Sequence, residues 1–472
     1  SMSDEAEETA AENTAAEPTD IYDDDGVLRS DYLARVGAAI ADRDILFLKE
    51  QVASLHESEL GDLLESLQSE QRKALVALLG EDFDFTALTE VDESVRREIV
   101  GDLPIEQMVE GLGELDSDDA VYILEDLDPE EQDDILSRLP FTERVRLRRS
   151  LDYPEETAGR RMQTEFVAVP PFWSVGQTID YLREDENLPF SFAQVFVVDP
   201  TFRLLGAIDL DRILRSRREV RVEDIMHETS RSIPASMDQE DAAQLMSQYD
   251  LLSAAVVDEN NRLVGVLTID DVLDMIQEEA EEDIKFLGGV GDEELSDNVI
   301  STVRSRFPWL LVNLATAILA SLIIGIFDAT IQQMVALAVL MPIVASMGGN
   351  AGTQTLTVTV RALATRDLDI YNAARIIRRE TWIGLINGLL FAVLVAIMAF
   401  VWFGNMQLGF VIAIAMVINM VSAALAGILL PLLLDKIGVD PALASAVFVT
   451  TVTDVVGFFS FLGLAGWWFG VL

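Results

Sequence analysis

The chain has 472 residues, with 81 Asp or Glu against 33 Lys or Arg, and its formal net charge at pH 7 is −48. Residues 301–472 hold eight of the bases and seven of the acids, so residues 1–300 hold the other 25 bases and 74 acids and carry −49. A surface this acidic argues against nucleic acid as a partner and favours cations, although solubility in a saline habitat is an alternative explanation. The absence of cysteine excludes disulfides and thiolate metal sites.

The first residues are strongly acidic and contain no basic side chain. Residues 1–26 have ten acids, no Lys or Arg and no apolar core, which is unlike a signal peptide and typical of a disordered segment. We therefore predict a disordered acidic tail over residues 1–29 as the first part of a multidomain chain.

An apolar residue recurs at every twelfth position of the next segment, and several of these residues are followed directly by helix-starting Asp or Pro. Twelve residues suit one short helix and a turn, and a fixed period indicates stacked units that share a core. We predict an all-α domain over residues 30–158, a superhelical repeat of short helices, with an acidic turn at Asp116, Asp118 and Asp119. The repeat positions are Leu55, Leu67, Leu79, Val91, Leu103, Leu115, Leu127, Leu139 and Leu151.

A second repeat has an offset of 59 residues. The segment "VVDPTFRLLGAIDLDRIL" at residues 197–214 matches "VVDENNRLVGVLTIDDVL" at residues 256–273, and each reads as strand, turn, strand and helix. This α/β pattern strongly resembles a tandem pair of cystathionine-β-synthase-type (CBS) modules. We assign the pair to residues 159–280.

The CBS resemblance implies a possible nucleotide site. In that family a Thr or Ser, with an Asp three residues later, often holds the ribose of an adenine nucleotide such as ATP. Thr268 and Asp271 fit this pattern in the second copy, whereas the first copy has Asp209 and Arg212 at the equivalent positions. The resemblance therefore implies at most one site.

A helix rich in acids follows the second copy. Like charges at i and i+4 destabilise a helix unless they are neutralised, and no Lys appears among them before Lys285. A divalent cation would neutralise them, while an acidic face exposed to solvent is the common alternative. We predict a connecting helix over residues 281–306. The acids are Asp271, Asp274, Glu278, Glu279, Glu282 and Asp283.

The last third contains five segments that are apolar enough to cross a lipid membrane, for which ~20 residues are needed. They predict an α-helical membrane domain over residues 307–472. Basic residues precede the first span and fill the loop between the second and third, so we place the N-terminus in the cytoplasm and the C-terminus outside. The expected spans are 308–327, 331–360, 382–403, 408–434 and 441–468.

Two of these spans contain polar side chains, which are costly in lipid unless they line a wet path. In the fifth span, Asp454 lies 13 residues after Pro441, or ~20 Å along a helix, which is near mid-membrane. No basic residue lies within the core of any span to pair with it. The second span has one polar helical face, formed by Asn350, Thr353, Gln354 and Thr357.

Mg²⁺ suits such a site because it keeps several waters and needs only one or two carboxylates. We expect carbonyl and amide oxygens from a Gly-Gly-Asn turn at residues 348–350 to complete it. A soft transition metal would favour His, Cys or Met, and the two histidines, His56 and His227, lie in the soluble part. We predict no enzyme, because no nucleophile elbow or phosphate-binding glycine loop is present.

Together, "MGGNAGTQ", "RALATRDLD", "GVDPALAS" and "TTVTDVVGFF", in an acidic helical, CBS and five-span order, resemble the MgtE family of magnesium channels. The resemblance implies a homodimer in the lipid of the bacterial cell membrane, with a pore between the second and fifth spans. It implies that Asp454 is the main pore ligand, with Gly348, Gly349, Asn350 and Thr450 around it. Implied regulatory Mg²⁺ ligands are Asp118, Asp119, Asp238, Glu240, Asp250, Asp271, Asp274, Glu279, Glu282 and Asp283.

We therefore predict Mg²⁺ uptake that is closed when cytoplasmic Mg²⁺ binds between the helical domain, the CBS pair and the connecting helix. A CBS-regulated transporter or channel for another divalent cation such as Co²⁺ is the main alternative. An anion channel is disfavoured by the carboxylate in a span. A membrane-anchored nucleotide sensor would not need five spans with polar faces.

Overall fold

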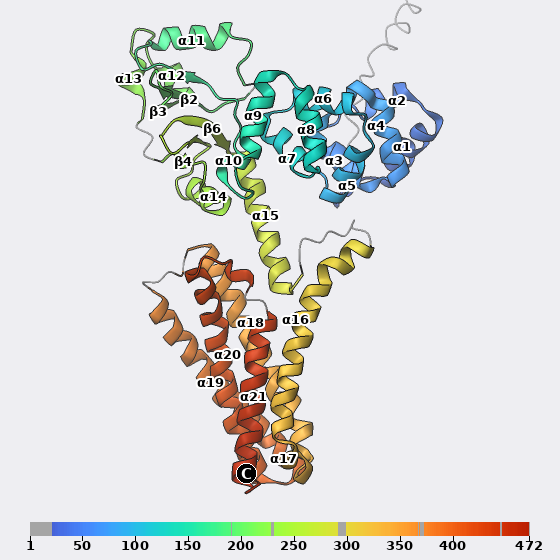
Figure 1. Ribbon diagram of the computed structural model, residues 1–472, viewed down its shortest axis with the longest axis vertical. Helices are drawn as coiled ribbons and strands as arrows, with labels where there is room; N and C mark the ends of the chain where they lie inside the picture. The colour runs from blue at the N-terminus through green and yellow to red at the C-terminus, as the bar shows by residue number, and fades with distance from the viewer. Residues whose placement is uncertain are drawn as a thin grey trace, which may run out of the picture. The chain divides into compact units, whose positions relative to one another are not determined.

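The computed structural model describes residues 21–189, 191–227, 231–290, 299–366, 368, 372–443 and 446–471. The chain divides into two units, Ser1–Leu273 and Asp274–Leu472, and each is described by itself. The predicted fold classes are confirmed: short helices come first, then two small sheets with helices, then five long apolar helices (Figure 1).

The predicted acidic tail, residues 1–29, extends too far toward the C-terminus, because its last nine residues belong to the helical domain. Residues 1–20 lie outside the described residues, but residues 21–29 pack on the helical domain. Ile21 and Leu28 are buried in its core, and Tyr22 Oη donates to Asp62 Oδ2 at 2.6 Å. Two apolar residues among many acids were sufficient for packing, which the overall composition did not indicate.

The helical domain follows the twelve-residue repeat. Leu67, Leu103, Leu115 and Leu139 each come directly after a helix and have extended backbone, and the next helix starts two residues later. All nine repeat residues belong to the domain's hydrophobic core or pack against it. Its helices are α1 Ser30–Asp42, α2 Ile45–Gln51, α3 Glu57–Ser66, α4 Ser69–Leu79, α5 Glu93–Asp102, α6 Ile105–Glu114, α7 Ser117–Glu125, α8 Pro129–Arg138 and α9 Phe141–Leu151, with 3₁₀ turns Gly80–Asp82 and Phe85–Leu88.

A buried arginine, Arg96, holds this stack together. Its Nε donates to Asp126 Oδ2 at 2.5 Å, and its Nη1 donates to the carbonyl oxygens of Leu88 and Val91 at 3.3 and 3.2 Å. The guanidinium lies over the ring of Tyr122, 4.4 Å from its centroid. Arg96 therefore joins α5 to the end of α7, to the 3₁₀ turn Phe85–Leu88 and to the residues that follow this turn.

Asp126→Ala should destabilise the helical domain by about 3 kcal/mol or more, because it leaves a buried charge without its counter-ion. Hydrogen exchange of the α5 and α7 amides measures this loss as a lower local unfolding free energy. Glu93→Ala is the matched control, since Glu93 pairs with Arg97 on the exposed face of α5 at 2.6 Å and should cost under about 1 kcal/mol. Equal effects of the two changes would contradict the prediction.

The CBS pair contains two three-stranded sheets of identical topology. In each, the first strand is parallel to the second and the second is antiparallel to the third. The two-residue first strands were not predicted. The elements are α10 Ala158–Arg161, β1 Ala168–Val169, α11 Val175–Glu184, β2 Gln194–Val198, β3 Leu204–Asp209, α12 Leu210–Arg215, α13 Val222–Ile225, β4 Ile233–Pro234, α14 Gln239–Gln248, β5 Ser253–Val257 and β6 Leu263–Thr268.

The two copies pair with each other through equivalent atoms. Leu204 N donates to Asn261 O, and Leu263 N donates to Phe202 O, both at 3.0 Å. Each atom of the second bond lies 59 residues from its equivalent in the first, so the copies are related by a local two-fold axis. Their strands share one hydrophobic cluster, which makes the pair a single module.

Five helices in the second unit are long and apolar enough to cross a membrane. α20 is central, since 56% of its span is buried against 6% for α16. On α19, Gly388 allows close packing, since a Cβ there would lie 3.1 Å from Val417 Cα on α20. The elements are α15 Ile269–Gly288, α16 Val299–Ile326, α17 Asp328–Gln333, α18 Ala336–Ala364, α19 Ala373–Phe403, α20 Met406–Lys436, a 3₁₀ turn Pro441–Leu443 and α21 Ala446–Trp468.

Three predicted boundaries are corrected. The connecting helix begins within the second CBS copy and ends at Gly288, because α15 is continuous, while residues 299–306 belong to α16 and 291–298 lie outside the described residues. The second long helix starts five residues late, since α17 occupies residues 328–333. The fifth starts at Ala446, so Asp454 lies ~12 Å into a helix ~34 Å long rather than at its middle.

Candidate ion pathway and metal sites

Asp454 is half-buried on α21 and has no hydrogen-bond or ion-pair partner among the described residues. The preceding residue, Thr453, is fully buried, and its Oγ1 donates to Thr450 O at 2.9 Å. Thr450, one turn before Asp454, contacts α18, since a Cβ on Gly349 would lie 3.2 Å from Thr450 Cγ2. The structure thus brings two predicted pore residues, Gly349 and Thr450, into contact, and Asp454 lies one turn further along α21.

The predicted Gly-Gly-Asn turn is wrong. Residues 348–350 lie inside the continuous helix α18, so their backbone carbonyls are already acceptors within the helix. Gly348 and Gly349 are buried, whereas Asn350 is exposed in the single chain, as are Gln354 and Thr357 on the same face. Side-chain oxygens of this face, rather than turn carbonyls, are therefore the available polar groups on α18.

A cluster of acids joins the helical domain to the CBS pair. Asp118, in the first turn of α7, is hydrogen-bonded to Asp271 in the first turn of α15. Asp118 Oδ1 is buried and has no partner among the described residues. Asp119, Asp116 and Asp270 add negative charge. The predicted ligands Asp118, Asp119 and Asp271 therefore meet, although Asp271 lies 152 residues after Asp119 in sequence.

Burial and mutual repulsion raise the carboxyl pKa values in this cluster. Burial is the larger cause for Asp119, whose pKa rises to about 7, and for Asp271, whose pKa rises to about 6; the pKa of Asp118 is also raised well above its usual range. Asp118 donates its retained proton to Asp271, which explains how two buried carboxyl groups can touch without a cation.

The Mg²⁺ affinity of this cluster should rise as pH increases through about 6 to 7. Mg²⁺ needs the carboxylate form and must displace the retained protons, so binding is weak below the raised pKa values. Without Mg²⁺, these raised pKa values stabilise the fold at low pH, and that stability is lost as pH rises through about 7. Titration calorimetry at pH 5.5, 7 and 8 measures how the Mg²⁺ affinity depends on pH. Asp118→Asn should weaken this dependence. A Mg²⁺ affinity that does not change with pH would contradict the proposal that these carboxyl groups bind the ion.

Thr268 and Asp271, the predicted nucleotide residues, contact each other. Thr268 Oγ1 donates to Asp271 Oδ2 in a short bond, and Thr268 N lies 3.4 Å from the same oxygen. This arrangement caps the start of α15, so the pair has a structural role in the fold. Asp271 also belongs to the acidic cluster, and nucleotide binding stays a prediction.

The other predicted regulatory acids do not form one site. Asp238 caps α14 by accepting from Glu240 N at 2.9 Å, while Asp250 follows the other end of α14, ~18 Å away. Three more lie along α15, at positions 274, 279 and 282. Asp274, Glu279 and Glu282 have interactions of their own, and their role as Mg²⁺ ligands remains a prediction.

A second pair of acids lies at the other end of α15. Asp283 lies near Asp440, which precedes the 3₁₀ turn at residues 441–443. Burial, followed by repulsion from Asp440, raises the pKa of Asp283 to about 6. Phe286 and Leu287, one turn later, pack with Leu356 and other apolar residues at the adjoining ends of α18, α20 and α21. Sequence reasoning missed Asp440; its position beside Pro441 at the start of a span was the available signal.

Among the described residues, no group of three or more His, Cys, Asp and Glu side chains is arranged to hold a metal. A cation bound at these acidic contacts would therefore need waters or further groups as ligands, which suits Mg²⁺ better than a metal that loses its hydration shell.

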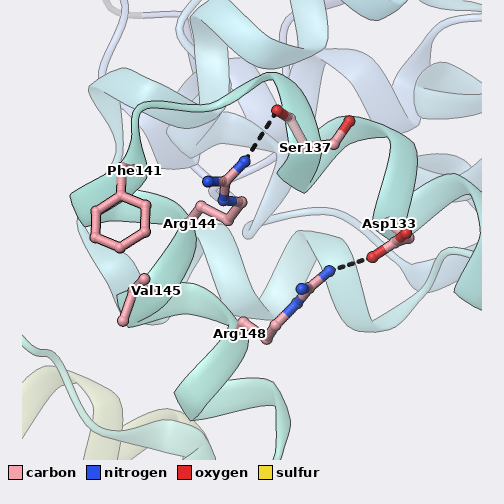
Figure 2. Close-up of a pocket in the computed structure, with 6 residues that line it drawn as sticks. All are labelled: Asp133, Ser137, Phe141, Arg144, Val145 and Arg148. Atoms are coloured by element: carbon pink, nitrogen blue, oxygen red, sulfur yellow. Dashed lines mark hydrogen bonds and ion pairs between the residues drawn. The ribbon is translucent and has the colours of Figure 1, made fainter.

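A shallow pocket of about 390 Å³ lies elsewhere, between α8 and α9 (Figure 2). Its arginines are occupied: Arg144 donates to Ser137 O at 3.3 Å, and Arg148 pairs with Asp133. Phe141 and Val145 form its apolar wall. None of the predicted sites falls in this pocket.

Comparison with known proteins supports the family. Residues 341–464 match the divalent cation transporter domain of MgtE, residues 55–156 its intracellular N domain, and residues 222–278 a CBS domain. A magnesium transporter MgtE of Thermus thermophilus is 33% identical over 433 residues, which is 90% of this chain and 96% of that protein. The chain belongs to the MgtE family. The expected family resemblance is thus confirmed, and the protein is a multi-pass membrane protein.

Two further MgtE relatives each cover part of the chain. The Enterococcus faecalis magnesium transporter MgtE is 36% identical over 315 residues, 67% of this chain and 70% of that protein. The crystal structure of "the cytosolic domain of the Mg²⁺ channel MgtE in complex with ATP" has 29% identity and a TM-score of 0.48, and covers 51% of this chain and 99% of that one.

Proposed function

We propose that this protein is a Mg²⁺-selective channel for magnesium uptake across the bacterial cell membrane, with its N-terminus in the cytoplasm and its C-terminus outside. The observation that carries the proposal is Asp454, a carboxylate inside a membrane helix without a partner among the described residues. An ionised carboxylate there needs a cation or water. A hydrated Mg²⁺ could use Asp454 with few other protein ligands.

A second copy of the chain would complete this pathway. Asn350, Gln354 and Thr357 form a polar face that α18 leaves exposed in a single chain, within a span. Polar faces of membrane helices are covered by protein or water rather than lipid. We propose that the exposed faces of two copies meet around a wet axis, with Asp454 from each copy beside it.

We propose that cytoplasmic Mg²⁺ closes this channel at the acidic contacts. Without Mg²⁺, Asp118, Asp119 and Asp271 can stay together only while they retain protons, and each proton that they lose adds repulsion between them. Asp440 likewise repels Asp283. A bound Mg²⁺ ion would attract the carboxylates on both sides of each contact. It would thereby hold α15 in the position in which Phe286 and Leu287 pack against the apolar residues of α18, α20 and α21. Each contact needs to bias the open and closed states by only a few kcal/mol.

Mg²⁺ influx into proteoliposomes that contain the full chain tests the proposal. We expect influx at micromolar Mg²⁺ on the cytoplasmic face and inhibition at millimolar Mg²⁺ on that face. Na⁺ and Ca²⁺ should enter at lower rates. Entry of Co²⁺ faster than Mg²⁺ would favour Co²⁺ as the substrate. The absence of any cation flux would refute the channel function.

A further inference from the structure

Asn419 lies in the middle of α20, and its side chain has no exposed surface. Its Nδ2 donates to Val344 O on α18 at 2.7 Å. The buried threonines Thr359 and Thr453 instead donate to carbonyls of their own helices. Of these three buried side chains, only Asn419 links two membrane helices.

Glycines on two neighbouring helices face this amide. A Cβ on Gly348 of α18 would overlap Asn419 Nδ2, and one on Gly457 of α21 would lie 2.9 Å from it. Both positions therefore need glycine while residue 419 is Asn. Gly348 lies two residues before Asn350, and Gly457 lies about one turn after Asp454. Three helices thus meet at one amide, beside the polar groups of the proposed pore.

Stability alone does not explain an asparagine here. Asn419 Oδ1 is buried and has no hydrogen-bond partner among the described residues. A buried acceptor without a partner is unfavourable, and an apolar side chain of similar shape would avoid that cost. Close approach between membrane helices needs small residues such as these glycines but no amide. The amide is therefore better explained by the geometry that it imposes.

We propose that Asn419 is a positioning residue for ion selection. By holding α18 through Val344 and filling the space between Gly348 and Gly457, it fixes the distance between the polar face of α18 and Asp454 on α21. That distance decides which hydrated ion fits between them. The inference rests on the proposed channel function and adds a residue that does not touch the ion.

Asn419→Leu in the full chain is the main test, because it keeps the approximate shape and removes both the donor and the unpaired acceptor. We expect the melting temperature in detergent to stay within about 3 °C of the wild-type value. The Mg²⁺ to Na⁺ permeability ratio, from reversal potentials in planar bilayers, should fall at least tenfold. Thr359→Val removes a hydroxyl from the same bundle and should leave the ratio unchanged. A wild-type ratio in Asn419→Leu would overturn the proposal.

A second pair of variants applies if Asn419→Leu does not fold or conduct. Gly348→Ala should lose Mg²⁺ flux because its Cβ overlaps the amide, and Asn419→Ala should restore flux in the double variant. Independent effects of the two changes would overturn the contact that the proposal needs. Wild-type protein without Mg²⁺ current would refute the channel itself, whereas wild-type current with an unchanged ratio refutes only the role of Asn419.

Discussion

Asp454→Ala should lower Mg²⁺ influx by about 100-fold or more while the protein still folds. In a medium of low dielectric constant, one carboxylate at close range stabilises a divalent cation by several kcal/mol, and about 2.7 kcal/mol already corresponds to a factor of 100. Asp454 is only half-buried and has no partner among the described residues. Replacing it with Ala should therefore leave neither a large cavity nor an unpaired polar group. Flux of Mg²⁺ into proteoliposomes at low cytoplasmic Mg²⁺ measures the loss.

Two variants control for this change. Asp454→Asn keeps the size of the side chain and should also fail, which separates the effect of charge from that of space. Asp435→Asn changes an exposed carboxylate at the end of α20 and should conduct normally. Influx within about twofold of wild type in Asp454→Ala would remove it as the pore ligand and turn attention to the polar face of α18.

Asp440→Asn should raise the cytoplasmic Mg²⁺ concentration needed for half-inhibition by about tenfold or more, equivalent to about 1.4 kcal/mol. Asp440 is near enough to repel Asp283, and a Mg²⁺ ion that bridges the two would need both as carboxylates. The amide oxygen can keep the hydrogen bond that Asp440 Oδ1 accepts from Ala442 N at 2.8 Å, so the 3₁₀ turn at residues 441–443 should be preserved.

Asp440→Lys should have the opposite effect and close the channel at low Mg²⁺. A fixed ammonium beside Asp283 supplies the positive charge that Mg²⁺ otherwise brings, so α15 should stay packed without the ion. Asp435→Lys, an equal charge change on a nearby exposed residue, should leave gating close to wild type. Channel flux measured against the cytoplasmic Mg²⁺ concentration tests both Asp440→Asn and Asp440→Lys. If the inhibition curves of both variants match that of the wild type, the Mg²⁺ sensor does not include Asp440.

Sequence patterns with a local physical cause were reliable in this chain. The twelve-residue repeat predicted short helices because each unit packs one apolar residue in or against the core, and the 59-residue repeat predicted two equivalent strand pairs. Segments of apolar residues predicted the five long helices. Asp454 could be singled out because a carboxylate in an apolar span is costly wherever the helix packs.

Boundaries were less reliable, since they depend on a few contacts. Ile21 and Leu28 extend the helical domain into a segment whose composition favours disorder. The 3₁₀ turn at residues 441–443 delays the start of α21 and changes the depth of Asp454. The continuous α18 removes the turn that the Gly-Gly-Asn segment suggested, because glycines in this helix serve close packing against Asn419 and Thr450.

The sequence by itself determined the order of domains, the five spans, the excess of acids and the candidate pore carboxylate, because composition and periodicity reflect contacts within a few turns of chain. Only the tertiary structure decided that Asp118 meets Asp271, that Asp283 lies near Asp440, and that Asn419 lies between Gly348 and Gly457. These partners are 153, 157, 71 and 38 residues apart in sequence. Their proximity results from how helices pack, which no local pattern of residue types encodes.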